Sequence, residues 1–284
     1  MARGSVPTAL TIAGSDSGGG AGLQADLRTF AMHRVHGMSA VTCITAQNTL
    51  GVNRVDALSP ESVAAQIDAV VDDIGVDGAK TGMLLNAAII ETVADRLQHW
   101  QIKQLVVDPV MVSRTGAQLI DQAAMETLCD CLLPRALITT PNVYEAQLLA
   151  GMPLKSLEDM KAAAAKILDM GPQYVVVKGG GLAEDLQGMD LWMDSSSGEC
   201  TVLRTELVNT PHTHGTGCTL AAAIAANLAR GLDPLTAAKE AKNYVTNALK
   251  HSLAIGSGQG PVGHFYPLLQ NVGTAEMRND GVRR

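Results

Sequence analysis

The sequence predicts an α/β fold built on a mostly parallel sheet with helices on both faces. Short, uninterrupted apolar runs alternate with amphipathic helical patterns along the chain, as expected where buried parallel strands are joined by helices. Several of these runs stop at Gly or Pro, which is typical of strands that end in a loop. No Ser-, Pro- or Gly-rich linker divides the 284 residues. We therefore expect one domain over residues 1–284, with its core at about 8–268 and a polar tail after about 270.

The strands are predicted from the apolar runs. The first run, residues 9–13, ends at a glycine-rich stretch. Residues 190–194 and 200–205 are separated by Ser195–Glu199, and this is the one clear hairpin signal. We expect that hairpin to extend one edge of the sheet antiparallel. The other strands are expected at residues 39–45, 77–81, 104–107, 137–140 and 174–177.

The helices are predicted from their apolar stripes and their capping residues. Ser59 before Pro60 suits an N-cap followed by the first helical position, and Asp233 before Pro234 does the same. Residues 156–159 resemble a capping box. Helices are accordingly expected at residues 21–33, 60–74, 87–100, 122–132, 156–170, 216–230 and 235–251.

Composition excludes several classes of function. The net charge of −7 argues against a nucleic-acid binder that uses a broad basic face, and two Phe, two Trp and four Tyr are too few for base-stacking platforms. The five cysteines are scattered and odd in number, which does not fit a disulfide framework. No run approaches the ~18 apolar residues of a membrane span. We expect a cytoplasmic protein without a membrane or nucleic-acid partner.

The carboxyl ends of the predicted strands are where a ligand is expected, because parallel strands in open α/β sheets end at a common rim. The segments that follow these strands are rich in glycine and in polar side chains. They are residues 14–22, 47–49, 81–83, 108–110, 142–145 and 178–181.

The glycine-rich segment 14–22 follows the first strand and opens a helix. Residues 20–25 fit the pattern G-x-G-x-x-A of dinucleotide-binding loops. That pattern also requires an acidic residue about 20 positions on, yet there is none from Leu27 to Val55. We interpret the loop as backbone that lies close to a small ligand, with Asp16 and Asp26 as polar groups. A glycine-rich turn without a ligand is the alternative.

Residues 214–219 open a long helix with the sequence HGTGCT. The first N–H groups of a helix lack intrahelical partners and carry partial positive charge, so this turn could receive a phosphoryl group. The glycines at 215 and 217 let a bulky anion approach. We expect a lowered pKa for the Cys218 thiol in this turn, which would let the residue accept a proton. The alternative is that Cys218 is simply a small buried residue.

Two acidic residues and one lysine follow neighbouring predicted strands. Asp108 and Glu145 together could hold Mg²⁺ through water, as a nucleotide triphosphate site requires. A first-turn glutamate favoured by the helix dipole is the alternative for Glu145. Lys178 could neutralise phosphate charge, although a solvated lysine at a strand end would look the same. Met83 and Val110 could form an apolar pocket wall or belong to the core.

Taken together, these motifs resemble the ribokinase superfamily. Within it, the chain is similar to the hydroxymethylpyrimidine/phosphomethylpyrimidine kinases of thiamine biosynthesis. The matching blocks keep the family order over roughly residues 8–252. They are IAGSDSGGGAGLQAD at 12–26, TAQNT at 45–49, KTGML at 80–84, VDPVM at 107–111, TPNVYEA at 140–146, VKGG at 177–180 and HTHGTGCT at 212–219.

The resemblance implies a ribokinase-like fold and an ATP-dependent kinase. Enzymes of this family phosphorylate the hydroxymethyl group of 4-amino-5-hydroxymethyl-2-methylpyrimidine and then convert the monophosphate to the diphosphate. The resemblance also implies ATP and Mg²⁺ as cofactors and a homodimer as the assembly. Whether K⁺ is required is left open by the sequence.

The resemblance also assigns roles to residues. Gln47 matches the glutamine that hydrogen-bonds the aminopyrimidine, since an amide can both donate and accept. Cys218 takes the place of the general base, where many sugar-kinase relatives have aspartate. The remaining substrate-pocket positions are Gly14, Asp26, Met83 and Val110, and the anion hole is matched by Gly215, Thr216 and Gly217.

The nucleotide side is implied in the same way. Asn142 and Glu145 match an N-x-x-E pair near Mg²⁺ and the phosphates, with Glu145 and Asp108 as the residues near the metal. The residues that we place on the nucleotide side are Asn142, Asp108, Lys178 and His214.

Two other functions remain open at this point. A pyridoxal or pyridoxine kinase would share the fold and the anion hole, although Gln47 favours a pyrimidine. A non-catalytic nucleotide- or pyrimidine-binding protein is the second alternative, and the intact segment 215–218 argues against it.

Overall fold

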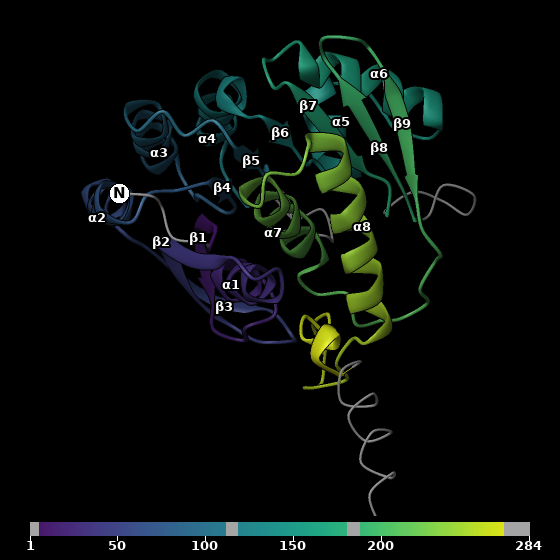
Figure 1. Cartoon of the computed structure of the whole chain (residues 1–284), viewed down its shortest axis with the longest axis horizontal. Coiled ribbons are helices and arrows are strands. Elements are labelled where there is room, and N and C mark those ends of the chain that lie inside the picture. Colours follow the sequence, from purple (N-terminus) through teal and green to yellow (C-terminus); the bar gives the residue numbers. More distant parts are fainter. Residues whose placement is uncertain (1–5, 112–118, 181–187, 270–284) are drawn as a thin grey trace, which may run out of the picture.

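The computed structural model describes residues 6–111, 119–180 and 188–269. The tail expected after about residue 270 lies outside these residues. In the described part of the chain, nine strands form one sheet in the order β3-β2-β1-β4-β5-β6-β7-β8-β9 (Figure 1). The strands are β1 (Thr8–Asp16), β2 (His36–Gln47), β3 (Val52–Ala57), β4 (Gly78–Thr81), β5 (Leu105–Val107), β6 (Ile138–Thr139), β7 (Tyr174–Lys178), β8 (Met189–Asp194) and β9 (Cys200–Arg204).

Seven of the α-helices in the described residues lie close to predicted segments, whereas α5 was not among the expected helices. The helices are α1 (Gly22–Met32), α2 (Pro60–Asp73), α3 (Ala87–His99), α4 (Gln122–Thr127), α5 (Val143–Ala150), α6 (Leu157–Leu168), α7 (Thr216–Ala229) and α8 (Pro234–Lys250). Ser59 caps α2 through its side chain, and the capping box of α6 is present as predicted.

The prediction of a mostly parallel sheet is confirmed. The six strands from β2 to β7 pair in parallel, and β8 and β9 form the expected antiparallel hairpin at one edge. The opposite edge carries a second hairpin that the sequence analysis did not predict, because β3 pairs antiparallel with β2. All six residues of β3 are exposed, so the strand lacks the continuous apolar run used to find the others.

The helix expected at residues 122–132 is shorter than predicted. Regular α-helix ends at Thr127, and residues 128–132 form a π-turn in which the Leu133 N–H donates to the Leu128 carbonyl. A 3₁₀ turn with Pro134 follows. Proline has no N–H and its ring disfavours a continuing α-helix, which explains why the segment changes geometry here.

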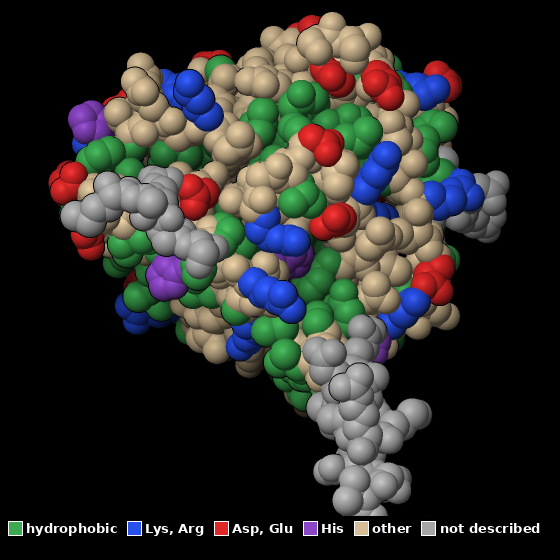
Figure 2. Space-filling view, viewed as in Figure 1, with side chains coloured by type: hydrophobic (Ala, Val, Ile, Leu, Met, Phe, Trp, Pro, Cys, Tyr) green, Lys and Arg blue, Asp and Glu red, His purple; other side chains and the backbone are tan. Residues whose placement is uncertain are grey.

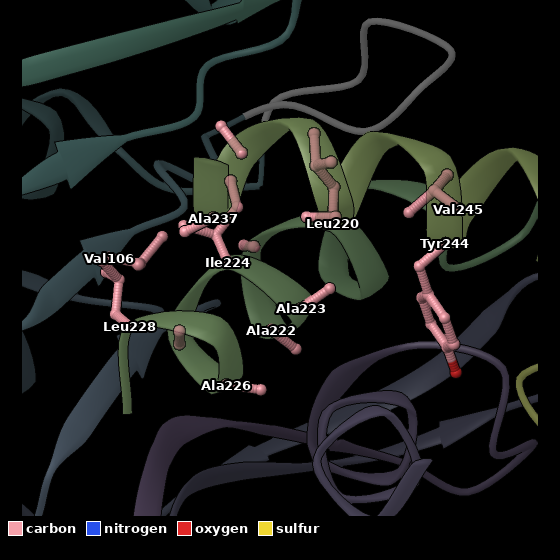
Figure 3. Close-up of a cluster of buried hydrophobic side chains, with 14 of the residues drawn as sticks. Val106, Leu220, Ala222, Ala223, Ile224, Ala226, Leu228, Ala237, Tyr244 and Val245 are labelled. Atoms are coloured by element: carbon pink, nitrogen blue, oxygen red, sulfur yellow. The ribbon is translucent and has the colours of Figure 1, made fainter. Parts of the chain in front are cut away.

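The two faces of the sheet are covered by different helices. Helices α1, α7 and α8 pack on one face, while α2 to α6 pack on the other. Side chains of β5 alternate between the faces, with Val106 against α7 and its neighbours Leu105 and Val107 against the opposite cluster. Figure 3 shows Val106 with the apolar side chains of α7 and α8.

Helix α7 is buried along its length, from Thr219 to Leu228. Its alanines allow close packing on the sheet: a Cβ added at Gly78 would come within 2.7 Å of the Ala225 carbonyl oxygen. This packing fixes the N-terminal turn of α7 at the carboxyl end of the sheet, where the site lies.

The surface agrees with the charge of the sequence. Lys/Arg and Asp/Glu side chains are interspersed on the face seen in Figure 2, without a broad basic patch. Within the described residues, no helix is long and apolar enough to cross a membrane.

Candidate active site

Asp16 organises the glycine-rich loop at the end of β1. Its Oδ1 accepts the Gly18 N–H at 2.9 Å, and its Oδ2 accepts those of Gly20 at 3.1 Å and Ala21 at 2.9 Å. His214 Nε2 lies 2.9 Å from the same Oδ2. Burial works against the charge, but the hydrogen bonds from His214 and the backbone outweigh it and lower the pKa of Asp16. The carboxylate thus binds the loop to the segment before α7, rather than pointing to a ligand as we expected.

The first turn of α7 has the geometry of an anion-binding site. Gly215 is the N-cap and has φ +82°, and a Cβ there would collide with the Gly20 carbonyl oxygen, so only glycine fits. A Cβ added at Gly217 would lie 3.3 Å from Lys178 Nζ, which places a cation beside this turn. Among the described residues, the N–H groups of Gly217 and Cys218 have no protein acceptor.

Cys218 departs from its predicted chemistry. Burial raises the pKa of its thiol, and the nearby carboxylates of Asp26 and Asp108 raise it further. Lys80 and the Gly22 N–H oppose this shift without cancelling it. The expectation of a lowered thiol pKa was therefore wrong, because it considered only the helix start and not the dry, acidic surroundings.

Asp26 was expected to line the substrate pocket, and this is also corrected. Its side chain is completely buried and receives Lys80 Nζ at 2.9 and 3.1 Å and the Thr11 hydroxyl at 2.7 Å. Burial opposes the charge of Lys80, but Asp26 outweighs it and raises the lysine pKa. The pair forms part of the floor beneath the site, with its polar atoms turned to each other.

A second charged cluster lies at the ends of β5, β6 and β7. Lys178 Nζ donates to Asp108 Oδ1 at 2.8 Å, and the Thr140 hydroxyl donates to the same oxygen at 3.0 Å. Burial opposes the charge of Asp108, but Lys178 and Lys80 outweigh it and lower the pKa of this carboxyl. The structure therefore brings the predicted residues Asp108 and Lys178 together.

Glu145 joins this cluster and also caps its own helix. Its carboxylate accepts the Asn142 N–H at 2.8 Å while Asn142 Oδ1 accepts the Glu145 N–H at 3.0 Å, which is a capping box. The capping role considered for Glu145 is thus present. Burial raises the pKa of Glu145 to about 7, with Asp108 adding to the shift and Lys178 opposing it.

The two carboxylates fit an ion that is held mostly by other ligands. In the described residues, no group of three or more His, Cys, Asp and Glu side chains could hold a metal. Asp108 and Glu145 alone suit Mg²⁺ that keeps several waters and binds phosphate oxygens. Burial is the main cause of the raised pKa of Glu145, with Asp108 adding to it, and a cation bound nearby would favour the charged form of this carboxyl.

The predicted substrate residues gather at the ends of β1, β2 and β4. A Cβ added at Gly14 would come 2.6 Å from Cys43 Sγ and 3.0 Å from Met83 Cε, so these residues are in close contact. The Thr45 hydroxyl donates to Gln47 Oε1 at 3.2 Å. Val110 is half-buried after β5, with its N–H donating to the Asp108 carbonyl at 2.9 Å.

His214 was predicted on the nucleotide side, and the structure places its ring against Gln47, one of the predicted substrate residues. Its Nε2 lies 3.4 Å from Gln47 Nε2 and 2.9 Å from Asp16 Oδ2. Within the described residues, no hydrogen bond or ion pair joins its ring to Asp108, Lys178 or Glu145. A sequence block shows that His214 precedes the anion hole, but it does not show to which side the ring turns.

A cavity of about 540 Å³ opens beside Lys178 and Gly217. It runs between the edge hairpin, the segment 205–210 and α8. Asp190 and Lys242 line it and form an ion pair of 2.8 Å, and Asp190 Oδ1 also accepts the Gly179 N–H at 3.0 Å.

Sequence reasoning missed Asp190 and Lys242. We examined only the residues that follow parallel strands. Asp190 is the second residue of the antiparallel strand β8 and pairs in register with Lys178, so it reaches the same rim from the other direction. The first residues of a predicted antiparallel edge strand are the signal that could have found it.

The C-terminal segment 256–264 packs against both the loop after β2 and the segment before α7. Gln259 N–H donates to the Thr49 carbonyl at 3.1 Å, next to Gln47 in sequence. His214 N–H donates to the Gly260 carbonyl at 3.2 Å, and Val262 N–H donates to the His214 carbonyl at 3.2 Å. This segment therefore ties the loop after β2 to the anion hole.

The comparisons with known proteins agree with this arrangement. A sequence model of the phosphomethylpyrimidine kinase family matches residues 16–263. The hydroxymethylpyrimidine/phosphomethylpyrimidine kinase of Synechococcus elongatus is 63% identical over 263 residues, which cover 93% of this chain and 99% of that protein.

Solved structures give the same picture. An ADP complex of Bacillus subtilis pyridoxal kinase matches with a TM-score of 0.87 at 41% identity, covering 93% of this chain and 100% of that one. Phosphomethylpyrimidine kinase from Clostridium difficile 630 matches with a TM-score of 0.77 at 40% identity, covering 86% of this chain and 99% of that one. The predicted α/β class is thereby confirmed.

Proposed function

The chain belongs to the phosphomethylpyrimidine kinase family, and from this premise we propose that it uses ATP to phosphorylate a pyrimidine alcohol in thiamine diphosphate biosynthesis. The substrate is 4-amino-5-hydroxymethyl-2-methylpyrimidine, and its monophosphate is then converted to the diphosphate. The observation that supports this best is the first turn of α7, whose free N–H groups lie beside Lys178 at the mouth of the cavity.

The arrangement suits phosphoryl transfer, which depends on positioning and charge neutralisation more than on covalent chemistry. The cavity beside Lys178 and Gly217 holds the nucleotide, with its phosphates directed to the first turn of α7. The pyrimidine lies on the other side, against Gly14, Gln47 and Met83. The N–H groups of Gly217 and Cys218 then stabilise the phosphoryl group between the two substrates.

Cys218 accepts the proton of the attacking alcohol in this proposal. To do so it must be a thiolate, which Lys80 and the Gly22 N–H favour and which burial and two carboxylates oppose. We therefore expect the reaction to accelerate as pH rises toward the pKa of the thiol.

Asp108 and Glu145 would hold Mg²⁺ through water. When bound, the ion supplies positive charge to the triphosphate. Lys178 then has two tasks, since it neutralises Asp108 in the free protein and faces the phosphates in the complex.

The proposed homodimer would use the edge of the sheet formed by β2 and β3. Ile44, Val52 and Val55 are exposed there, between 41% and 51% of their surface. Light scattering coupled to size-exclusion chromatography measures the assembly, and a monomer at micromolar concentration would contradict this part of the proposal.

The function is tested by incubating the protein with MgATP and the pyrimidine alcohol and resolving the mono- and diphosphate products. Pyridoxal is assayed in parallel because a solved pyridoxal kinase is 41% identical to this chain. We expect both pyrimidine phosphates, with pyridoxal turned over more slowly. Faster turnover of pyridoxal would favour the hypothesis of a pyridoxal kinase. Binding of the pyrimidine or the nucleotide without any product would favour the hypothesis of a non-catalytic binding protein.

Gln47→Ala tests the assignment of the pyrimidine side. Loss of the amide should raise KM for the pyrimidine about tenfold, the value of one or two hydrogen bonds, while KM for ATP stays unchanged. Steady-state kinetics with each substrate varied measures this. Gln104→Ala removes an exposed glutamine far from the site and serves as the control. An unchanged pyrimidine KM in Gln47→Ala would refute the contact.

A further inference from the structure

We propose that His264 is a positioning residue of the anion hole, acting through Thr219 on the carbonyl of Gly215. The proposal rests on the function proposed above. His264 lies in the C-terminal segment, Thr219 in the first turn of α7, and Gly215 is the N-cap of that helix. The sequence analysis did not connect these residues with one another.

The hydrogen bonds run in one direction only. Thr219 Oγ1 lies 2.8 Å from the Gly215 carbonyl oxygen and 2.9 Å from His264 Nε2. A carbonyl cannot donate, so the single hydroxyl proton of Thr219 goes to Gly215. His264 must therefore carry its proton on Nε2 and donate it to the Thr219 oxygen. The contacts thus fix the tautomer of the histidine.

His264 acts here as a neutral group. Its side chain is 3% exposed, and burial, with a smaller contribution from Arg28, lowers its pKa to about 4. A neutral ring with its Nε2 proton already engaged does not compete with Lys178 for phosphate. Its contribution is therefore geometric and not electrostatic.

The backbone of His264 is held rigidly from α8. The Tyr244 hydroxyl donates to the His264 carbonyl at 2.7 Å, and Gly263 N–H donates to the Ala248 carbonyl at 2.9 Å. The position of the His264 ring, and with it the position of the Thr219 hydroxyl, is therefore fixed by these contacts with α8.

The far end of this relay holds the peptide group that leads into the turn with the free N–H groups of Gly217 and Cys218. Gly215 has positive φ, and its carbonyl accepts both the Thr219 hydroxyl and the Thr219 N–H, the latter at 2.9 Å. The carbonyl of Gly215 and the N–H of Thr216 belong to one planar peptide group, so holding the oxygen orients the start of the turn. Without the hydroxyl, one of the two restraints on this peptide is lost.

The kinetic test compares variants that remove the relay with variants that keep it. His264→Leu and Thr219→Val abolish it, whereas His264→Gln retains a donor and Thr219→Ser retains the hydroxyl. We expect the first two to lower kcat about tenfold or more with both KM values within twofold of the wild type, because misplacement of the turn affects transfer more than binding. His264→Gln and Thr219→Ser should restore most of the rate.

Thr127→Val is the matched control. Thr127 lies in α4, away from the site, and likewise donates its hydroxyl to the carbonyl four residues before it, Ala123, at 2.8 Å. It should lose this hydrogen bond as Thr219→Val does while kcat is unchanged. Full kcat in His264→Leu, or equal losses in His264→Gln and His264→Leu, would overturn the proposal.

Hydrogen exchange gives a readout that needs no turnover. In peptides that cover residues 213–219, His264→Leu and Thr219→Val should exchange several-fold faster than the wild type, while His264→Gln and Thr127→Val should not. Unchanged exchange in His264→Leu overturns the proposal whatever the rates. A wild-type protein that phosphorylates no alcohol would instead refute the proposed function, and the exchange result would still decide the role of His264.

Discussion

Lys80 and Lys178 each form an ion pair with an aspartate near Cys218, and the pairs have nearly the same length, 2.9 Å with Asp26 and 2.8 Å with Asp108. Their surroundings differ. Both side chains of the first pair are completely buried, whereas Lys178 is 14% exposed and borders the cavity.

The difference lies in what else each pair contacts. The Thr11 hydroxyl completes the first pair, and its polar atoms face one another. The second pair has an additional carboxylate, Glu145, whose pKa is raised to about 7. The same two residue types therefore serve as scaffold where their charges balance in a closed space, and as a candidate binding site where an extra charge and an opening remain.

Lys80→Met should have the largest effect on the free energy of unfolding. It leaves the Asp26 carboxylate buried without a counter-charge, which destabilises proteins by about 3–5 kcal/mol. Urea unfolding measures the loss, with the exposed Lys103→Met as control. Neutralising both partners in Lys80→Met/Asp26→Asn should destabilise less than Lys80→Met alone. A loss below about 1 kcal/mol in Lys80→Met would be typical of a solvent-exposed ion pair and would contradict the burial of Lys80 and Asp26.

Cys218→Ala tests the residue that lies between the pairs. Removing a general base lowers kcat about 100-fold or more, and pyrimidine affinity should change little. The variant should also lose the increase in rate at alkaline pH, since burial raises the pKa of the thiol in the wild type. The exposed Cys200→Ala is the control. Wild-type turnover in Cys218→Ala would remove the thiol from the mechanism.

Lys178→Met should affect activity more than stability, whereas the main effect expected of Lys80→Met is on stability. We expect kcat/KM for ATP to fall about 10- to 100-fold, equivalent to about 1.4–2.7 kcal/mol, because a cation beside the phosphates is lost. The free energy of unfolding should change less than in Lys80→Met. Lys161→Met removes an exposed ion pair and should alter neither quantity much. Full activity in Lys178→Met would assign both pairs to the scaffold.

Glu145→Gln should have the smallest effect, on the pH dependence of stability without Mg²⁺ or nucleotide. The folded-state pKa of about 7 exceeds the ordinary value of 4.5, so the stabilisation is full below pH 4.5 and is lost as pH rises through 7. The wild type should therefore lose on the order of 1 kcal/mol across this window, and Glu145→Gln should lose less. Urea unfolding at pH 5 and pH 7.5 measures this. An equal slope in both proteins, with the exposed Glu91→Gln as control, would contradict the assignment.

The parallel part of the fold was predictable because most of its strands, such as β5 and β7, are short apolar runs that can be recognised without knowing their partners in the sheet. The strand β3 was not, since it is exposed and its sequence, VNRVDA, has no buried face. The π-turn at residues 128–132 was missed because the apolar pattern continues through it.

The candidate site was predictable as a set of positions but not as a set of partners. Asp26 and Lys80 are 54 residues apart in the sequence, and only the fold shows that they form an ion pair with each other. The thiol pKa was wrong because the argument from the helix start is local, whereas burial depends on the whole chain. Thr219 and His264, 45 residues apart, gave no joint signal at all.

The connection between residues 256–264 and the rest of the site has a consequence for synthesis. The ribosome makes these residues after every strand and helix of the sheet, yet Gly260 and Val262 hold His214 on both sides. A nascent chain can therefore form its sheet and the cavity beside Lys178 before the segment that leads into α7 is held from both sides. The first turn of α7 is thus the part of the candidate site that depends on the last residues to leave the ribosome.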